Sequence, residues 1–287
     1  MTAIYKKEIR SYFTSMIGCV FIAFALGIIS LYFFALNLYG GYPYLGYALS
    51  STTMLFLILI PVLTMKCMAE DRRQRTDQML LTAPVSTWQI IVSKYMAMVT
   101  VFMIPVCVIA LYPLILSSYG TISYGMAYAS ILGFALMGLM AIAVGLFISS
   151  ITESQVIAAV LTFLILFVSY MAEAIAELIP STAWVSFAAF AALVVVAAIV
   201  IYSLTASLFA GGLIGAAGIL FLFVRYMLDS SAFEGAFGKL LSALCLTGHY
   251  ENFVSGIVDI PGIIFYLSGS FLFLFLSVQA VEKRRWC

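Results

Sequence analysis

The sequence predicts an all-α integral membrane protein, a polytopic bundle of about eight transmembrane helices, with six as the alternative count. Of its 287 residues, 65% are hydrophobic and 9% are charged, against roughly 45–50% and about 25% in an ordinary soluble domain. The charged residues are also separated by long uncharged intervals, and an ionised group at the bilayer centre costs at least about 2.5 kcal/mol. At roughly 20 residues per span, these observations exclude a water-soluble globule and leave no room for a large soluble catalytic domain.

Five uncharged intervals locate the predicted spans: residues 11–65, 95–152, 154–172, 178–224 and 260–281. The first is broken at residues 37–43, which contain two glycines and a proline, and the second at residues 117–120, so each predicts two helices. Residues 178–224 predict a tight hairpin that turns near residues 202–205. Without this hairpin the count is six, and because both counts are even, the two termini stay on the same side.

The basic residues predict the orientation, because Lys and Arg in short loops stay on the cytoplasmic side. An eight-span path that begins inside places eleven of the thirteen Lys and Arg residues in the cytoplasm and leaves Arg225 and Lys239 outside. The twelve carboxylates divide equally between the two faces, so the inner face carries +5 and the outer face −4. The sequence therefore predicts a plasma-membrane protein, a single transmembrane domain over residues 1–287 with both termini cytoplasmic.

Residues 1–16 predict an amphipathic elbow helix that lies on the inner leaflet. Apolar residues recur at helical spacing on one face, and Lys6, Lys7 and Arg10 lie on the other. No clear small-residue cleavage site follows, so a cleaved signal peptide is not indicated. The alternative is a basic anchor that only fixes the topology.

The longest predicted cytoplasmic loop, residues 70–86, predicts a short surface helix from about Asp71 to Leu81. Two pairs of opposite charge four residues apart support it: Asp71 with Arg75, and Arg73 with Asp77. Because this helix would have a charged face and an apolar end, it is typical of a docking element for a cytoplasmic partner. The alternative is an ordinary basic loop.

The end of this loop carries the signals of a new helix. Pro84 stops the preceding helix, and Ser86 with Gln89 forms a capping box. The third span is therefore predicted to begin just after Ser86.

Two separated motifs carry a family resemblance. Residues 69–86 read AEDRRQRTDQMLLTAPVS, with Lys94 opening the next span, and this string resembles the coupling region of ABC type-2 permeases. The C-terminal part, from HYENFVSGIVD at residues 249–259 to VEKRRW at residues 281–286, is similar to the C-terminus of the gliding-motility type permease family, which includes relatives of the permease for nitrous-oxide-reductase maturation. The resemblance covers nearly the whole chain, although many members carry Gly-Thr-Ile-Glu where this chain has residues 75–78.

The resemblance implies a prokaryotic permease that pairs with a second copy or a paralogue and docks a separate ABC ATP-binding subunit. ATP and Mg would lie on that subunit, so no cofactor is expected on this chain, and an extracytoplasmic auxiliary protein and membrane lipid are further expected partners. Members commonly have six spans, so residues 181–227 would be an added hairpin. The implied contacts with the ATP-binding subunit are Glu70, Asp71, Arg72, Arg73, Arg75, Thr76, Asp77, Gln78, Leu80 and Leu81.

The polar segment of residues 229–259 predicts an interfacial structure on the outer face. Its first part predicts a half-sunk helix with Phe233, Phe237, Leu240, Leu241 and Leu244 on one face, and its second part a short helix that begins at Phe253. The resemblance implies that these are re-entrant helices that close the translocation path, with Phe233, Phe237, His249, Glu251 and Phe253 as outer gate candidates. The alternative is an interfacial loop without a gating role.

Missing motifs distinguish the function classes. The chain contains no G-x-x-x-x-G-K-[ST] phosphate loop, so ATP hydrolysis is not expected on it. The predicted span centres carry no ionisable relay of the kind that a secondary transporter uses, and no His, Cys or carboxylate constellation that would indicate an intramembrane enzyme or a metal site. The sequence therefore predicts the permease subunit of an ATP-driven exporter that binds no nucleic acid, and an ion-gradient-driven transporter or a membrane scaffold is the alternative.

Overall fold

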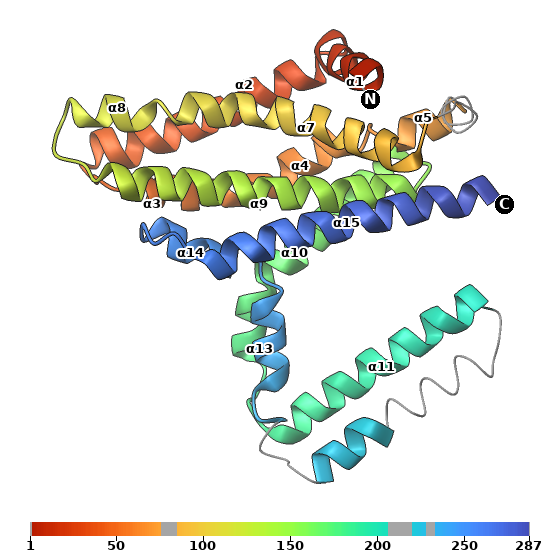
Figure 1. The fold of residues 1–287 in the computed structure, drawn as a ribbon. Helices are drawn as coiled ribbons and strands as arrows, with labels where there is room; N and C mark the ends of the chain where they lie inside the picture. The colour runs from red at the N-terminus through yellow and green to blue at the C-terminus, as the bar shows by residue number, and fades with distance from the viewer. Residues whose placement is uncertain (1, 76–84, 206–219, 228–232, 287) are drawn as a thin grey trace. The chain divides into compact units, whose positions relative to one another are not determined.

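The computed structural model describes residues 2–75, 85–205, 220–227 and 233–286, and all regular secondary structure in these ranges is helical (Figure 1). Six helices in them are long and apolar enough to cross a membrane: Ile17–Tyr39, Leu45–Arg73, Thr87–Ser117, Tyr124–Ile151, Gln155–Leu178 and Ile260–Lys283. The chain is therefore an all-α protein with the composition of a multi-pass membrane protein. The predicted count of eight is not confirmed: in the predicted hairpin, the apolar helical segment found within the described residues is Ala183–Val195, residues 220–227 are also helical, and residues 206–219 lie outside the described ranges.

The chain divides into two compact units. Unit 1, residues 1–168 and 249–287, contains α1 (Thr2–Thr14), α2 (Ile17–Tyr32), the π-helix η1 (Phe33–Tyr39), α3 (Leu45–Thr52), the 3₁₀ turn η2 (Thr53–Leu55), α4 (Phe56–Thr64), α5 (Ala69–Arg73), α7 (Thr87–Ile109), α8 (Tyr112–Ser117), α9 (Tyr124–Ile151), most of α14 (Gly248–Val254) and α15 (Ile260–Trp286). Unit 2, residues 169–248, contains α11 (Ala183–Thr205) and α13 (Ala236–Ala243). Helix α10 (Gln155–Leu178) begins in unit 1 and ends in unit 2.

The predicted breaks between spans are confirmed at both positions. Helix η1 ends at Tyr39 and α3 begins at Leu45, and α8 ends at Ser117 before α9 begins at Tyr124. The Ser86 cap is also present, since its hydroxyl oxygen accepts a hydrogen bond from the backbone N–H of Gln89 at 3.3 Å.

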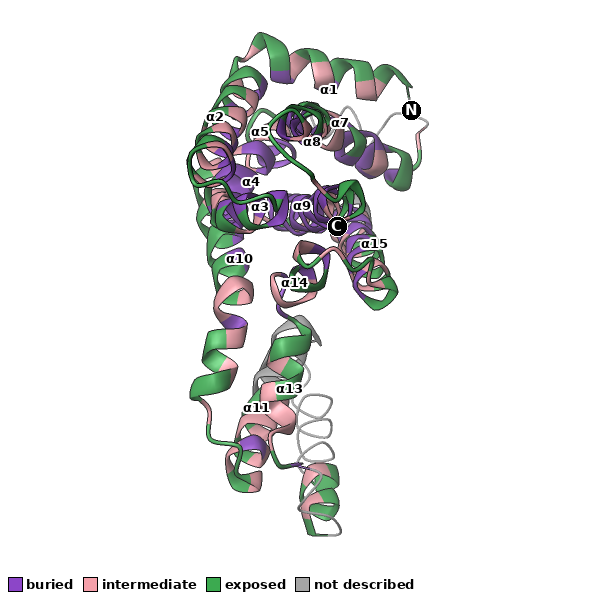
Figure 2. Cartoon of the chain, turned by 90° about the vertical axis from the view of Figure 1, so that its left-hand side faces the viewer, coloured by how far each residue is buried: buried purple, intermediate pink, exposed green. Residues whose placement is uncertain are grey.

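The core of unit 1 forms around α9, the most buried of the six apolar helices. It packs against α3, α4, α7 and α15, and Figure 2 shows the buried residues concentrated along it. Three rings from different helices, Phe56, Phe102 and Phe134, lie with centroids 4.7 to 6.5 Å apart. Because bilayer hydrocarbon is as apolar as these side chains, such close packing rather than water exclusion holds the helices together.

One end of unit 1 gathers segments that are far apart in sequence, and we call it the charged end (residues 2–10, 66–75, 85–94 and 282–286). Figure 1 shows α1, α5, the start of α7 and the end of α15 at this end. The hydroxyl of Thr87 donates to Glu282 at 2.8 Å, and the Arg72 guanidinium donates to the carbonyl of Thr152 at 3.2 Å. Segments that the charge distribution assigned to one side of the membrane therefore lie together.

The predicted continuous helix from Asp71 to Leu81 is wrong in its described part. Helix α5 covers only Ala69–Arg73, and Arg75 adopts a left-handed conformation with φ 57°, which ends the helix. Asp71, which the sequence predicts to pair with Arg75, instead forms an ion pair with Lys94 of α7. Residues 76–81 lie outside the described ranges.

Of the two helices predicted in residues 229–259, the first is present with different bounds, and the second, predicted to begin at Phe253, is wrong because residues 255–259 are not helical. Helix α13 begins at Ala236, after Gly235 with φ 65°, so Phe233 precedes the helix instead of lying within it. Helix α14 begins at Gly248 and ends at Val254, and Gly256 follows with φ 82°. Because glycine readily adopts positive φ, it terminates α14 where periodicity alone predicted a beginning.

Candidate functional site

Lys94 is the centre of a polar cluster at the charged end. Its side chain is 1% exposed, and its ammonium donates to Glu8 Oε1 at 3.0 Å, to the Cys67 carbonyl at 2.7 Å and to Asp71 Oδ2 at 2.5 Å. These contacts use all three donors of the ammonium group. We call Glu8, Cys67, Asp71 and Lys94 the Lys94 cluster; it joins α1, the α4–α5 segment and α7.

Local sequence explains how α1 reaches the cluster. Glu8 and Tyr12 are four residues apart, so they lie on the same face of α1. The Tyr12 hydroxyl donates to the Leu63 carbonyl at 3.1 Å, and the Tyr5 hydroxyl lies 2.9 Å from that of Thr100. Burial, reinforced by the nearby Cys67 and Glu8, raises the pKa of Tyr12 well above its ordinary value, so the phenol stays neutral.

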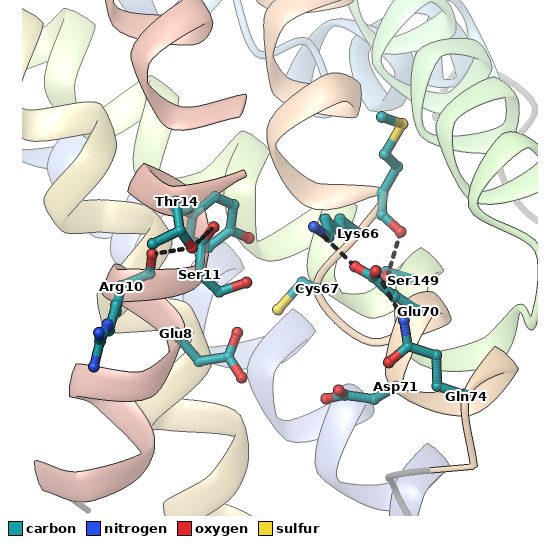
Figure 3. Close-up of polar contacts among 12 residues, drawn as sticks. Glu8, Arg10, Ser11, Thr14, Lys66, Cys67, Glu70, Asp71, Gln74 and Ser149 are labelled. Atoms are coloured by element: carbon teal, nitrogen blue, oxygen red, sulfur yellow. Dashed lines mark hydrogen bonds and ion pairs between the residues drawn. The ribbon is translucent and has the colours of Figure 1, made fainter. Parts of the chain in front are cut away.

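Helix α5 is held against α9 on its other side. The Ser149 hydroxyl oxygen accepts hydrogen bonds from the backbone N–H groups of Met68 and Ala69, at 3.1 and 3.2 Å. It also donates to the Met65 carbonyl at 3.4 Å (Figure 3). A helix start normally leaves such N–H groups without partners, so a side chain from another helix here caps α5.

A polar cavity of about 240 Å³ lies between α1 and residues 66–74. In Figure 3 the carboxylate of Glu8 on α1 and that of Asp71 on α5 both point toward this space. Glu70 in its wall pairs with Lys66 at 3.2 Å and accepts from the Gln74 amide at 3.1 Å. The described residues that line it are Lys7, Glu8, Ser11, Tyr12, Lys66, Cys67, Glu70, Asp71 and Gln74.

The predicted elbow and coupling residues differ in their exposure. Lys6, Lys7 and Arg10 are exposed on α1. Among the predicted contacts of the ATP-binding subunit, Arg73 and Arg75 are exposed, Glu70 and Asp71 are half-buried, and Arg72 is buried. Thr76, Asp77, Gln78, Leu80 and Leu81 lie outside the described ranges.

The outer gate candidates divide between the two units. In unit 1, Phe253 is fully buried and the exposed Glu251 lies on the same helix. The His249 ring stacks on Phe265 with centroids 4.1 Å apart. Phe233 and Phe237 belong to unit 2, where both pack against the Phe190 ring, at 6.3 and 5.6 Å.

Helix α14 is fixed to α9 through Ser130. The Ser130 hydroxyl donates to the Phe253 carbonyl at 2.9 Å, and the Tyr250 hydroxyl donates to the Ser130 carbonyl at 3.3 Å. A Cβ on Gly133 would lie 2.6 Å from the Phe253 side chain, so this close approach requires glycine.

Sequence reasoning missed the Lys94 cluster and the Ser149 cap. Lys94 carried the only available signal: an ionisable residue close to the start of an apolar span needs a partner, because its burial without one is costly. Glu8 was also visible on the same helical face as Tyr12, but nothing local assigns it to a residue 86 positions away.

The described residues were tested for metal-binding groups, and the chain was compared with known proteins. Among the described residues, no group of three or more His, Cys, Asp or Glu side chains could hold a metal ion. No protein-family model matches the chain, and no curated protein matches it with significant similarity.

Proposed function

We propose that this chain is the membrane-spanning permease subunit of an ATP-driven exporter of the ABC type-2 class, which forms the translocation path and docks a separate ATP-binding subunit through residues 70–82. The observation that supports this proposal best is the Lys94 cluster. It ties the segment that leads into the coupling loop to both α1 and α7, as a subunit that receives force at this loop requires.

The proposed coupling works through short, buried contacts. The ATP-binding subunit contacts the exposed Arg73 and Arg75 and the residues that follow them. A displacement there moves α5, whose Asp71 holds Lys94 of α7 and whose Arg72 holds the end of α9. Because packed interiors deform little, the displacement passes to these long helices rather than being absorbed at the loop.

The rest of the assembly follows from the same proposal. The charged end faces the cytoplasm, with both termini on that side of a prokaryotic plasma membrane. Helix α1 is the elbow helix, residues 181–227 add a hairpin to six spans, and residues 229–259 form the outer re-entrant segment. The permease pairs with a second copy or a paralogue, ATP and Mg bind the partner subunit, and an extracytoplasmic auxiliary protein completes the exporter.

Co-purification from the native cell tests the docking role. We expect Arg73→Ala combined with Arg75→Ala to abolish recovery of the ATP-binding subunit, because both side chains are exposed and outside the Lys94 cluster. The double variant Lys6→Ala, Arg10→Ala removes the same charge from α1 and should keep the partner. Equal recovery with all three proteins would contradict docking through this segment.

The energy source separates the exporter from its alternative. In proteoliposomes that contain the co-purified complex, transport should require ATP and should persist when a protonophore or a sodium ionophore removes ion gradients. Transport by the permease alone, driven by an imposed ion gradient, would favour the secondary transporter instead.

A further inference from the structure

A second cavity, of about 290 Å³, lies within unit 2, between the end of α10, the start of α11 and helix α13. We call it the unit 2 cavity; its described lining comes from residues 173–186 and 235–242. The backbone N–H of Gly235 donates to the Ser181 carbonyl at 3.0 Å, which ties the start of α13 to the connection between α10 and α11. Small-molecule sites begin at about 300 Å³, so the cavity has room for a small ligand.

Three charged side chains among the described residues line this cavity. Glu173 and Glu177 are four residues apart and so lie on the same face of α10, and Lys239 comes from α13. Within the described parts of the chain, none of these three side chains forms a hydrogen bond or an ion pair. Two carboxylates and one ammonium give the charged lining a net charge of −1, which favours a ligand with one positive charge.

Ser186 of α11 gives independent evidence for a ligand. The residue is 1% exposed, and its hydroxyl oxygen has no hydrogen-bond partner in the described part of the chain. Native proteins nearly always provide such a partner, because a buried hydroxyl without one is costly. A serine side chain is short, so this hydroxyl lies at the wall of the cavity that Ser186 lines. An ammonium group in the cavity would donate the missing hydrogen bond.

The rest of the lining favours an organic cation over a metal ion. No group of three or more His, Cys, Asp or Glu side chains in the described ranges could hold a metal. The Lys239 ammonium would also repel a divalent ion more strongly than a singly charged group. Ala176, Ile179 and Pro180 add apolar surface to the wall, which suits the hydrocarbon part of an amine.

We propose that the unit 2 cavity binds a small primary amine, with its ammonium at the two glutamates and the Ser186 hydroxyl and its hydrocarbon part against the apolar wall. The bound amine would join α10 to α11. Glu177 and Lys239 are exposed, which gives a ligand access to the cavity. No residue of the proposed coupling loop is in the described lining, so the inference does not depend on the proposed export function.

The test measures binding of butylamine to the detergent-purified full chain at neutral pH by saturation-transfer NMR, with empty micelles as the blank. Butanol and butyrate have the same chain length, without charge and with the opposite charge. We expect butylamine to bind about tenfold more tightly than butanol, the effect of one charge-assisted hydrogen bond, and butyrate to bind more weakly still. Equal affinities of butylamine and butanol would overturn the proposal.

Two further probes test the chemistry of the cation. Butyltrimethylammonium carries the same charge but has no N–H to donate, so it should bind more weakly than butylamine. Tighter binding of the quaternary ion would overturn the assignment to a primary amine. Displacement of butylamine by an equal concentration of Ca²⁺ would also overturn it, because the carboxylates would then form a metal site.

Variants with altered charge test the position of the ligand. Glu173→Gln should weaken butylamine about tenfold without changing butanol, and Lys239→Gln should strengthen butylamine because it removes a repelling charge. Glu234→Gln is the matched control, since Glu234 is an exposed residue of unit 2 beside Gly235 and does not line the cavity. Equal weakening by the two glutamate variants would show a general attraction to the surface and overturn the site.

Ser186→Ala tests the hydroxyl. It should weaken butylamine without lowering the melting temperature in the absence of amine, because the free protein then loses no hydrogen bond. Unchanged affinity for butylamine would show that water alone occupies this position and would overturn the assignment. If Glu173→Gln does not fold, the comparison of butylamine with butanol and the Lys239→Gln variant still decide, because both keep the two glutamates.

Discussion

Lys94 and Glu8 are joined by a 3.0 Å ion pair although they are 86 residues apart in the sequence. The pair is buried, with side chains 1% and 10% exposed. The carboxylates of Glu8 and Asp71 share this one ammonium, so its removal takes the same cation from both, and removing one side of a buried ion pair is the more costly way to disrupt it.

Lys94→Met should therefore destabilise the protein by about 3–5 kcal/mol, measured as unfolding in mixed detergent micelles. Lys66→Met is the matched control: its pair with Glu70 is partly exposed, at 21% and 26%, and should cost about 1 kcal/mol or less. Adding Asp71→Asn to Lys94→Met should restore part of the stability. Similar losses for the two lysine variants would show that the Lys94 cluster contributes no more than a surface pair.

The raised pKa of Tyr12 predicts that the protein loses stability at alkaline pH. Because the pKa of Tyr12 is raised in the folded protein, its contribution is complete below the ordinary tyrosine pKa of 10.0 and is lost as pH rises above it. The loss should approach about 1.4 kcal/mol per pH unit. The melting temperature, measured by thermal unfolding between pH 8 and 11, should fall less steeply with pH in Tyr12→Phe than in the wild type.

Tyr5→Phe on the same helix serves as the control for this measurement, since it removes a hydroxyl contact but leaves Tyr12 in place. It should retain the wild-type slope. If Tyr12→Phe and the wild type lose stability in parallel above pH 10, ionisation of another group is responsible.

Ser149→Ala should loosen the start of α5. The substitution leaves the N–H groups of Met68 and Ala69 without their acceptor and should cost about 1–2 kcal/mol, as for the loss of a helix N-cap. Hydrogen exchange of these two amides should accelerate. Ser150→Ala is the control, because its equally buried hydroxyl donates within its own helix, to Phe147 at 2.7 Å; faster exchange in both variants would contradict a specific cap.

Gly133→Ala should displace α14 from α9. Its new Cβ would lie 2.6 Å from Phe253, so the protein should lose about 1–3 kcal/mol, the usual cost of overpacking. Gly125→Ala in the same helix meets nothing within 4 Å and should instead stabilise by up to about 1 kcal/mol through helix propensity. Changes of the same sign in unfolding free energy would mean that α14 does not pack as described.

Local signals in the sequence predicted the fold class and several boundaries correctly. The breaks at residues 37–43 and 117–120 and the cap at Ser86 depend on glycine, proline and serine chemistry within a few residues. The hairpin at residues 181–227 was harder to predict, because an uncharged interval shows that residues can enter a membrane and not where a helix turns. Helix α11 begins in this segment at Ala183, but residues 206–219 lie outside the described ranges, and eight spans are not confirmed.

The sequence by itself determined that the chain is helical, apolar enough for six spans, and charged mainly in short segments between them. Only the tertiary structure decided what those charges do: Asp71, predicted to pair with Arg75, pairs with Lys94, and Glu8 of α1 pairs with the same ammonium. The physical reason is the sequence distance over which each kind of interaction acts. Hydropathy and helix capping act over one or two turns, whereas an ion pair across 86 residues exists only after packing has brought α1, α5 and α7 to one end of the bundle.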